Sequence, residues 1–253
     1  MIIDKSIKRV TVANTDIQRI MHGGGILWQK IDDLTGSPGP KELRGGNLQA
    51  GFYGEVPGKD FITGDELARR IGLTVGVSQY SNEPWLKFSY LGKVEFVAKK
   101  SFRYAISYND IAAANAVYGN KMVQINGLKY KVRLMKYKSE GKQDDKSSYR
   151  GTINHNSEWN RLMLPIHENA PSNWKYPKNV NSPTENWNIN YSSKDFTGYT
   201  NDMKGITVWC QDFGSGDDNH ICGRLLVPSY PDINSDYRNE EFLGWRPVLE
   251  LVD

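Results

Sequence analysis

Residues 205–230 read G-I-T-V-W-C-Q-D-F-G-S-G-D-D-N-H-I-C-G-R-L-L-V-P-S-Y, and residues 244–253 read G-W-R-P-V-L-E-L-V-D. Two apolar runs in this part of the chain, Ile206–Cys210 and Pro247–Val252, have β-branched or aromatic residues at strand spacing and are bounded by Gly or Pro. They bracket a segment rich in Gly, Asp, Asn and Tyr. We expect these two runs to be strands that close the fold. They would serve as a scaffold that displays the long polar segment between them.

Length and composition describe a globular chain with no charge bias. At 253 residues the chain can form one large domain or two small ones, and 38% hydrophobic with 24% charged residues is ordinary for a folded protein. The net charge of +3 is too small, and the Lys and Arg residues are too scattered, to indicate a nucleic-acid partner, and we expect none. The locally basic stretch 129–146 also contains Glu140, Asp144 and Asp145 and reads as a solvated strand and loop.

The start of the chain, M-I-I-D-K-S-I-K-R-V, lacks the basic flank and the long apolar stretch of a signal peptide. No run approaches the roughly 18 apolar residues that span a bilayer. We therefore expect synthesis in a cytoplasm and no insertion into a membrane.

Residues 1–31 are expected to form a small antiparallel unit. Ile7–Val12 and Ile17–Met21 alternate apolar and polar residues, and three glycines at 23–25 offer a tight turn into a third strand, Ile26–Ile31. Because neither a helix nor a Lys-Ser/Thr pair follows the glycines, they form no phosphate loop. Residues 32–47 carry Gly and Pro without an apolar period and are predicted to be a linker to a body of residues 48–253.

The body alternates short helices with hairpins. Thr63 and Glu66 form a capping-box pattern for a helix that Gly72 ends, and Ser107 caps a helix over Ile111–Tyr118 that Gly119 closes. A third helix is expected to begin near Asn156 or Ser157 and to stop at Pro165. Two hairpins are also expected: Trp85–Tyr90 with Val94–Ala98, and Met122–Ile125 with Leu128–Met135 across Asn126-Gly127.

Residues 168–200 are rich in Asn, Ser, Pro, Trp and Tyr without periodicity, too long for an ordinary connection. We expect Trp174 and Trp187, with nearby tyrosines, to anchor them against the core. The chain has seven Trp and fourteen Tyr against eight Phe, and Trp and Tyr suit half-exposed positions because each has an apolar body and a polar tip. We expect most of them to fill the core of a loop-rich fold and a minority to form a contact surface.

No common catalytic motif is present in the sequence. His155 and His167 flank the third helix and could act as general bases, although capping and packing roles are favoured. The cysteines Cys210 and Cys222 match no zinc spacing; two buried thiols are the default and a disulfide is the alternative. The oxygen-bearing residues Asp212, Asp217 and Asp218 could hold calcium, but the loop lacks a terminal bidentate Glu, and we favour a solvated loop without a metal or other cofactor.

Six stretches in order carry a resemblance to a known kind of module: L-G-K-V-E-F-V-A-K-K at 91–100, residues 107–120 with A-N-A-V-Y-G-N, V-Q-I-N-G-L-K-Y-K-V-R-L-M at 123–135, S-E-W-N-R-L-M at 157–163, T-V-W-C-Q at 207–211 and G-W-R-P-V-L-E at 244–250. The body resembles a module found near the C-terminus of tailed-phage and prophage structural proteins. The terminal G-W-R-P-V-L-E-L is similar to the closing motif of the C-type-lectin-like fold, which formylglycine-generating enzymes and phage tropism proteins share. The N-terminal unit is similar to attachment segments of tail and baseplate proteins.

The resemblance implies an α+β fold: an N-terminal antiparallel unit and a C-type-lectin-like domain with short helices and irregular loops. It implies a virion tail protein, made in the host cytoplasm, that contacts other tail proteins through residues 1–31 and forms a homo-oligomer. Its relatives display a Tyr- and Asn-rich surface, which here corresponds to Ser229–Glu241, with Trp245 and Arg246 in structural roles. The residues predicted to contact a host glycan or surface protein are Tyr230, Asn234, Asp236, Tyr237 and Asn239, with Trp174 and Trp187 as neighbours.

Two other interpretations stay open. One is a purely structural, decorating virion protein, in which the polar residues only solvate a loop. The other is an enzyme, either a cysteine-dependent oxidase of this fold or a glycan hydrolase. The sequence flanking Cys210 and Cys222 does not match that of the oxidases, and a carboxylate pair for glycan cleavage cannot be located without spatial distances. We therefore expect a binding protein and no enzyme.

Overall fold

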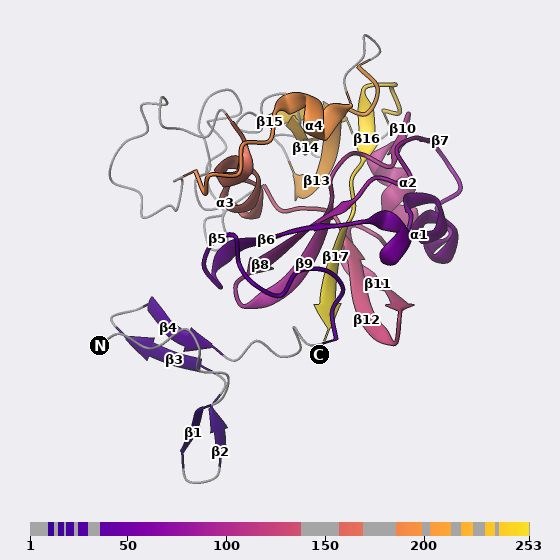
Figure 1. The fold of residues 1–253 in the computed structure, drawn as a ribbon. Helices are drawn as coiled ribbons and strands as arrows, with labels where there is room; N and C mark the ends of the chain where they lie inside the picture. The colour runs from indigo at the N-terminus through magenta and orange to yellow at the C-terminus, as the bar shows by residue number, and fades with distance from the viewer. Residues whose placement is uncertain are drawn as a thin grey trace.

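The computed structural model describes residues 36–137, 157–168, 186–198, 203–213, 219–224, 231–235 and 238–252, and the backbone of four short strands between residues 10 and 29. The described part is a mixture of helix and sheet in which strands predominate (Figure 1). No helix within it is long and apolar enough to cross a membrane.

The four N-terminal strands form two separate hairpins. Strand β1 (Val10–Val12) pairs with β2 (Thr15–Ile17), and β3 (Arg19–His22) pairs with β4 (Gly25–Gln29), each antiparallel. The strands before and after the glycines pair as predicted, with His22 opposite Gly25, whereas Gly23 and Gly24 lie outside the described residues. In the part of the chain that the structure describes, the strands of these hairpins belong to neither of the larger sheets.

A seven-stranded antiparallel sheet forms the centre of the body. Its order is β11-β12-β17-β9-β8-β6-β5. The strands are β11 (Tyr118–Ile125), β12 (Leu128–Arg133), β17 (Val248–Val252), β9 (Lys93–Ala98), β8 (Trp85–Tyr90), β6 (Ala50–Val56) and β5 (Gly45–Gly46). The Asn126-Gly127 turn between β11 and β12 is as predicted, with φ of 50° and 86° at its two residues. Residues 128–133 therefore continue antiparallel to β11, next to β17.

A second sheet has the order β15-β14-β13-β16-β10-β7. Its strands are β15 (Pro231–Ser235), β14 (Asn219–Arg224), β13 (Thr207–Phe213), β16 (Leu243–Trp245), β10 (Arg103–Tyr104) and β7 (Val77–Ser78). The β13–β16 pair is parallel and the other neighbours are antiparallel. The runs expected to close the fold together, now β13 and β17, lie in different sheets, since Arg246-Pro247 leads the chain from β16 into the larger sheet.

Within the described ranges, four short α-helices begin at capping residues. They are α1 (Gly64–Ile71), α2 (Tyr108–Ala113), α3 (Glu158–Met163) and α4 (Ser193–Thr197), and two 3₁₀ turns, Gly58–Asp60 and Leu164–Ile166, accompany them. Thr63 caps α1 as predicted, but the Glu66 carboxylate accepts hydrogen bonds from Arg69 and Arg70. No helix was predicted at α4, whose capping box joins Ser192 and Asp195.

The second helix is shorter than predicted. It ends at Ala113, and Gly119 lies inside β11 with φ of 83°, where the register of β11 against β12 shifts between Tyr118 and Lys121. The left-handed glycine therefore allows an irregularity in a strand and does not terminate the helix. The expectation of a helix over Ile111–Tyr118 was wrong because Ala-rich composition alone does not set its length.

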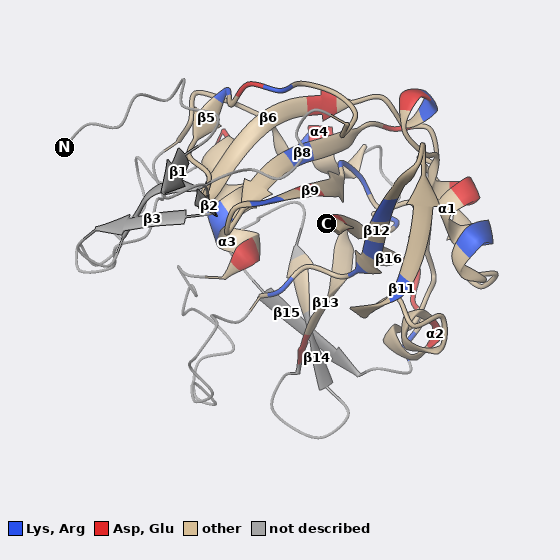
Figure 2. Ribbon diagram, turned by 90° about the horizontal axis from the view of Figure 1, so that it is seen from below, with Lys and Arg blue, Asp and Glu red and all other residues tan. Residues whose placement is uncertain are grey.

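Two apolar clusters flank the seven-stranded sheet. Trp85 joins a cluster with α1 and α2, whereas its neighbour Leu86 joins a cluster with α3 and α4. This alternation follows from the two-residue period of a strand. Figure 1 shows α1 and α2 on one side of the body and α3 and α4 on the other. Figure 2 marks the charged residues along the ribbon, among them several on α1 and the blue segments of β12.

The predicted structural roles of Trp245 and Arg246 are confirmed. Both are buried, and Arg246 donates from Nε to the Ala98 carbonyl at 2.6 Å. Its guanidinium lies 5.5 Å from the ring centre of Trp159 and 5.9 Å from that of Phe196. The G-W-R-P motif thereby joins both sheets and the α3–α4 side of the core.

Candidate functional site

The structure describes three of the seven predicted ligand-contact residues. Asn239 is exposed, Trp187 is half-buried, and Asn234 lies in β15, where the backbone alone is described. The other four lie outside the described residues: Trp174, Tyr230, Asp236 and Tyr237.

The predicted polar excursion Ser229–Glu241 contains a strand. β15 (Pro231–Ser235) pairs with β14 and forms one edge of the six-stranded sheet. Five strand residues extend over about 16 Å. Tyr230 and Tyr237 therefore flank a strand, and the segment is not the continuous loop that the sequence suggested.

Trp187 acts as a packing residue at the edge strand β5. Its backbone N–H donates to the Pro165 carbonyl at 2.9 Å, and its side chain lies so close to Gly45 that a Cβ there would meet the Trp187 Cβ at 2.3 Å. The anchoring role expected of this residue is thus present in the structure, and only part of the ring surface remains for a ligand.

The candidate calcium ligands are only partly described. Asp217 and Asp218 lie outside the described residues, and the Asp212 carboxylate accepts a hydrogen bond from the Tyr137 backbone N–H. Within the described ranges no group of three or more His, Cys, Asp or Glu side chains has the arrangement of a metal site. Asp212 therefore has a structural contact that accounts for its carboxylate.

Neither Cys210 nor Cys222 forms a disulfide in the structure, and both are buried. Burial, with Cys222 as a further contributor, raises the pKa of the Cys210 thiol well above its usual value. A thiolate nucleophile requires the opposite shift, so this environment suits a packing thiol.

We expect both thiols to resist modification in the folded protein. A maleimide added to the native chain at pH 7.5 should label neither cysteine over hours, whereas in denaturant it should label both within minutes, as mass spectrometry would show. Rapid native labelling of Cys210 would contradict its assignment as an inert buried thiol.

His167 is also a packing residue. It is 1% exposed, its ring stacks on Phe196 at 5.9 Å, and its Nε2 lies 3.2 Å from the Ser193 hydroxyl. Burial lowers its pKa, although the carboxylates of Glu168 and Asp195 act in the opposite direction. The packing role favoured from sequence is therefore the better account, and His155 lies outside the described residues.

One cluster of carboxylates could not be located from sequence. Arg133 is 4% exposed and contacts three carboxylates: Glu95 at 2.5 Å, Glu158 at 2.8 Å and Glu250 at 3.0 Å. Burial raises the pKa of Glu95 well above its usual value, with Arg133 opposing and Glu158 adding to the rise. Because Glu95 and Glu158 are each 1% exposed, this group joins β9, β12, β17 and α3 from within and offers no surface to a substrate.

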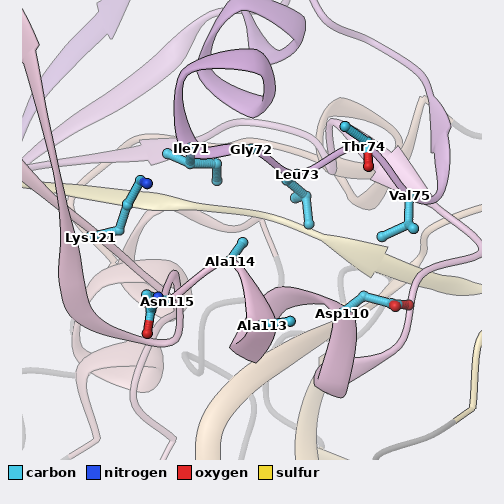
Figure 3. Close-up of a pocket in the computed structure, with 10 residues that line it drawn as sticks. All are labelled: Ile71, Gly72, Leu73, Thr74, Val75, Asp110, Ala113, Ala114, Asn115 and Lys121. Carbon is cyan, nitrogen blue, oxygen red and sulfur yellow. The ribbon is translucent and has the colours of Figure 1, made fainter.

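A half-open hollow of about 240 Å³ lies where α1 and α2 end (Figure 3). Residues 71–75 form one side of it, and residues of α2 and the turn after it form the other. Leu73, Ala113 and Ala114 supply apolar surface. We call this feature the α1–α2 hollow.

The two ends of the α1–α2 hollow differ in charge. Figure 3 shows Lys121 of β11 at one end and Asp110 of α2 at the other. The Asp110 Oδ2 atom accepts hydrogen bonds from the Ser107 backbone N–H and hydroxyl at 3.0 and 2.6 Å, so this carboxylate is held in place by its capping role. Within the described ranges Lys121 forms no ion pair, which leaves its ammonium available to a ligand.

Exposed apolar side chains occur near this hollow. Val75 lines it and is 42% exposed, and Tyr118 and Met122 of β11 are 51% and 43% exposed on either side of Lys121 in sequence. The Tyr118 hydroxyl lies 2.8 Å from that of Tyr108, which fixes its orientation. Sequence reasoning missed this site because α1 and β11 are about 50 residues apart and no local motif links them.

Comparison with known proteins gave no family model, no curated protein and no solved structure that matches this chain.

Proposed function

We propose that the chain is a virion tail or baseplate protein that attaches through residues 1–31 and presents its body to a host-cell surface. The observation that carries this proposal is the separation between the two N-terminal hairpins, whose strands pair with one another, and the two larger sheets of the body. An attachment unit whose strands pair with one another leaves the sheets of the body to form a separate binding surface. The proposal involves binding without catalysis.

A C-type-lectin-like body is the finer fold within this proposal. The buried Trp245-Arg246 pair supports it, since these residues pass from the six-stranded sheet into the seven-stranded sheet and contact the core. In such a body the G-W-R-P segment holds the fold together, and ligand contacts fall on other surfaces.

The α1–α2 hollow is the described surface through which we propose contact with a ligand. Pockets for drug-sized molecules occupy about 300–1,000 Å³, so a hollow of about 240 Å³ would accept a single unit of a larger glycan or peptide. The apolar side would contact the hydrophobic face of that unit, and Lys121 would bind an oxygen or carboxylate at one end. Weak binding at each site would be strengthened by copies on a symmetric particle.

The test is co-sedimentation of the full chain with purified bacterial envelopes: Gram-positive sacculi that retain their wall polymers, and Gram-negative outer-membrane vesicles. Saturable binding to at least one preparation is expected. Absence of binding to every preparation would favour the structural, decorating alternative, and release of reducing sugar into the supernatant would favour a glycan hydrolase.

Lys121→Glu should weaken this binding at least about tenfold, because the substitution reverses the charge at one end of the hollow. Lys129→Glu, at an exposed position of the adjacent strand β12, is the matched control and should bind as wild type. Equal binding by both variants would remove the hollow from the proposal. A loss in Tyr230→Ala with Tyr237→Ala would then place the contact at the ends of β15.

A further inference from the structure

Lys87 lies in the middle of β8 with its side chain fully buried. Its ammonium donates three hydrogen bonds to one short segment: to the Ser37 hydroxyl at 2.9 Å, the Pro38 carbonyl at 2.9 Å and the Pro40 carbonyl at 2.8 Å. We call residues 36–40 the strap. They belong to the predicted linker 32–47, and the structure places them against the sheet.

The strap is the reason that Lys87 is buried. The lysine lies over the rings of Tyr53 and Phe96, at 5.3 and 5.7 Å from their centres, with its charged end directed at the strap. Gly36, Gly39 and Pro40 are exposed on the outer side of the strap. If the strap lifted, the Lys87 ammonium would reach water, as lysines on sheet surfaces normally do.

The strap sequence S-P-G-P is suited to this position. Proline has no backbone N–H, so Pro38 and Pro40 offer carbonyl acceptors without competing donors. Gly39 has φ of 76°, and a Cβ at this residue would lie 2.3 Å from Val56 Cγ2. The glycine therefore permits both the turn and the close approach to β6.

The charges around Lys87 do not neutralise it. Lys41, which donates to the Ser37 carbonyl, is a like charge, and burial raises the pKa of Tyr53 on β6 to about 12, so the phenol is neutral. Phe96 of β9 is apolar, and none of the ion pairs within the described residues involves Lys87. Burial, with a smaller contribution from Lys41, lowers the pKa of Lys87 to about 7.

We propose that residues 36–40 are a proton-gated strap, which docks over Lys87 more tightly when the amine is neutral and is released more readily when the amine is protonated. Docking removes the charge from water at a cost that three oxygen acceptors offset only in part. Release returns the lysine to solvent, where it binds a proton readily.

The direction of the pH dependence of docking follows from the difference in the pKa of Lys87 between the docked and released states. A lysine with a pKa of about 7 when the strap is docked and an ordinary value of 10.5 when it is released binds protons more tightly in the released state. The docking equilibrium constant should then fall about tenfold between pH 8 and pH 6. Because the strap follows residues 1–31 closely in the chain, release would add up to about 17 Å of reach between the hairpins and the body. This inference rests on the strap contacts and not on the proposed function.

The experiment is limited proteolysis of the full chain at pH 6 and pH 8 with a broad-specificity protease. Cleavage within residues 36–44 is compared with cleavage of a free peptide of that sequence at the same pH, so that the protease's own pH response cancels. The normalised rate should be about tenfold higher at pH 6. Lys87→Met, which keeps the buried stem without a charge, should be cleaved slowly at both pH values.

Two results would overturn the proposal: a normalised rate that does not depend on pH, or the same pH response in Lys87→Met. If Lys87→Met does not fold, Ser37→Ala decides the question. It removes one oxygen acceptor of the charged amine and should increase cleavage at pH 6 more than at pH 8, whereas an equal increase at both pH values would contradict proton gating.

Discussion

Arg133→Met is expected to lower the free energy of unfolding by about 3–5 kcal/mol, the range observed when one partner of a buried ion pair is removed. Arg133 donates to Glu250 through Nε at 3.0 Å and to Glu158 through Nη1 at 3.0 Å. Burial lowers its pKa, but the carboxylates of Glu158 and Glu95 raise it well above the usual value. Without the guanidinium, the Glu158 carboxylate would remain buried with no cation. Urea unfolding followed by tryptophan fluorescence measures the loss.

Glu95→Gln is the matched control for Arg133→Met. The raised pKa of Glu95 means that the neutral form of this side chain, which glutamine resembles in shape, is favoured more strongly in the folded protein than in the unfolded chain. Its contribution to stability is thus complete below its ordinary value of 4.5 and is lost as pH rises through the folded value. Glutamine should cost less than about 1 kcal/mol, and its stability relative to wild type should improve with rising pH. A loss as large as that of Arg133→Met would show that Glu95 is ionised.

Trp159→Ala is expected to cost about 3–5 kcal/mol, as for other large buried aromatic residues. Trp159 is 1% exposed and lies between α3 and the six-stranded sheet, so close to Gly223 that a Cβ there would be 2.4 Å from Trp159 Cη2. Its ring also lies under the Arg246 guanidinium at 5.5 Å. Alanine would leave a cavity and remove this contact from a buried cation. Thermal and urea unfolding should both show the change.

Trp187→Ala is the control for Trp159→Ala, because it removes a side chain of the same size from a less buried position. This tryptophan is half-buried at the sheet edge beside Gly45, so its loss should cost about 1–2 kcal/mol. Similar losses for Trp159 and Trp187 would contradict the central position assigned to Trp159.

Local patterns predicted the elements whose geometry is set by neighbours in sequence. The Asn126-Gly127 turn, the Thr63 and Ser107 caps and the Gly72 stop were all read from a few residues, because turn and cap hydrogen bonds join positions two to four apart. The Ser157 cap of α3 was predicted in the same way.

Long-range relations could not be predicted. The place of β17 in the seven-stranded sheet depends on pairing partners more than 100 residues away, such as Lys129 opposite Val252. A lysine between Leu86 and Phe88 has the pattern of an exposed strand position, and only residues 36–40 explain its burial. For the same reason the linker prediction missed the strap, and the α1–α2 hollow escaped notice.

The candidate ligand surfaces and the residues that stabilise the fold are separate in this structure. Arg133, Trp159 and Arg246 are buried, whereas Lys121, Val75 and Asn239 are accessible. Substitutions of the first group should therefore change stability, and substitutions at exposed positions should stay within about 0.5 kcal/mol of wild type.

Co-sedimentation of the full chain with the envelope preparations tests the proposed function most directly, with the unfolding free energy of each variant measured in parallel. Saturable binding by wild type, lost in Lys121→Glu or in Tyr230→Ala with Tyr237→Ala and retained in Lys129→Glu at equal stability, is the predicted result. No saturable binding of the folded wild-type protein to any preparation would contradict a role in host-surface recognition.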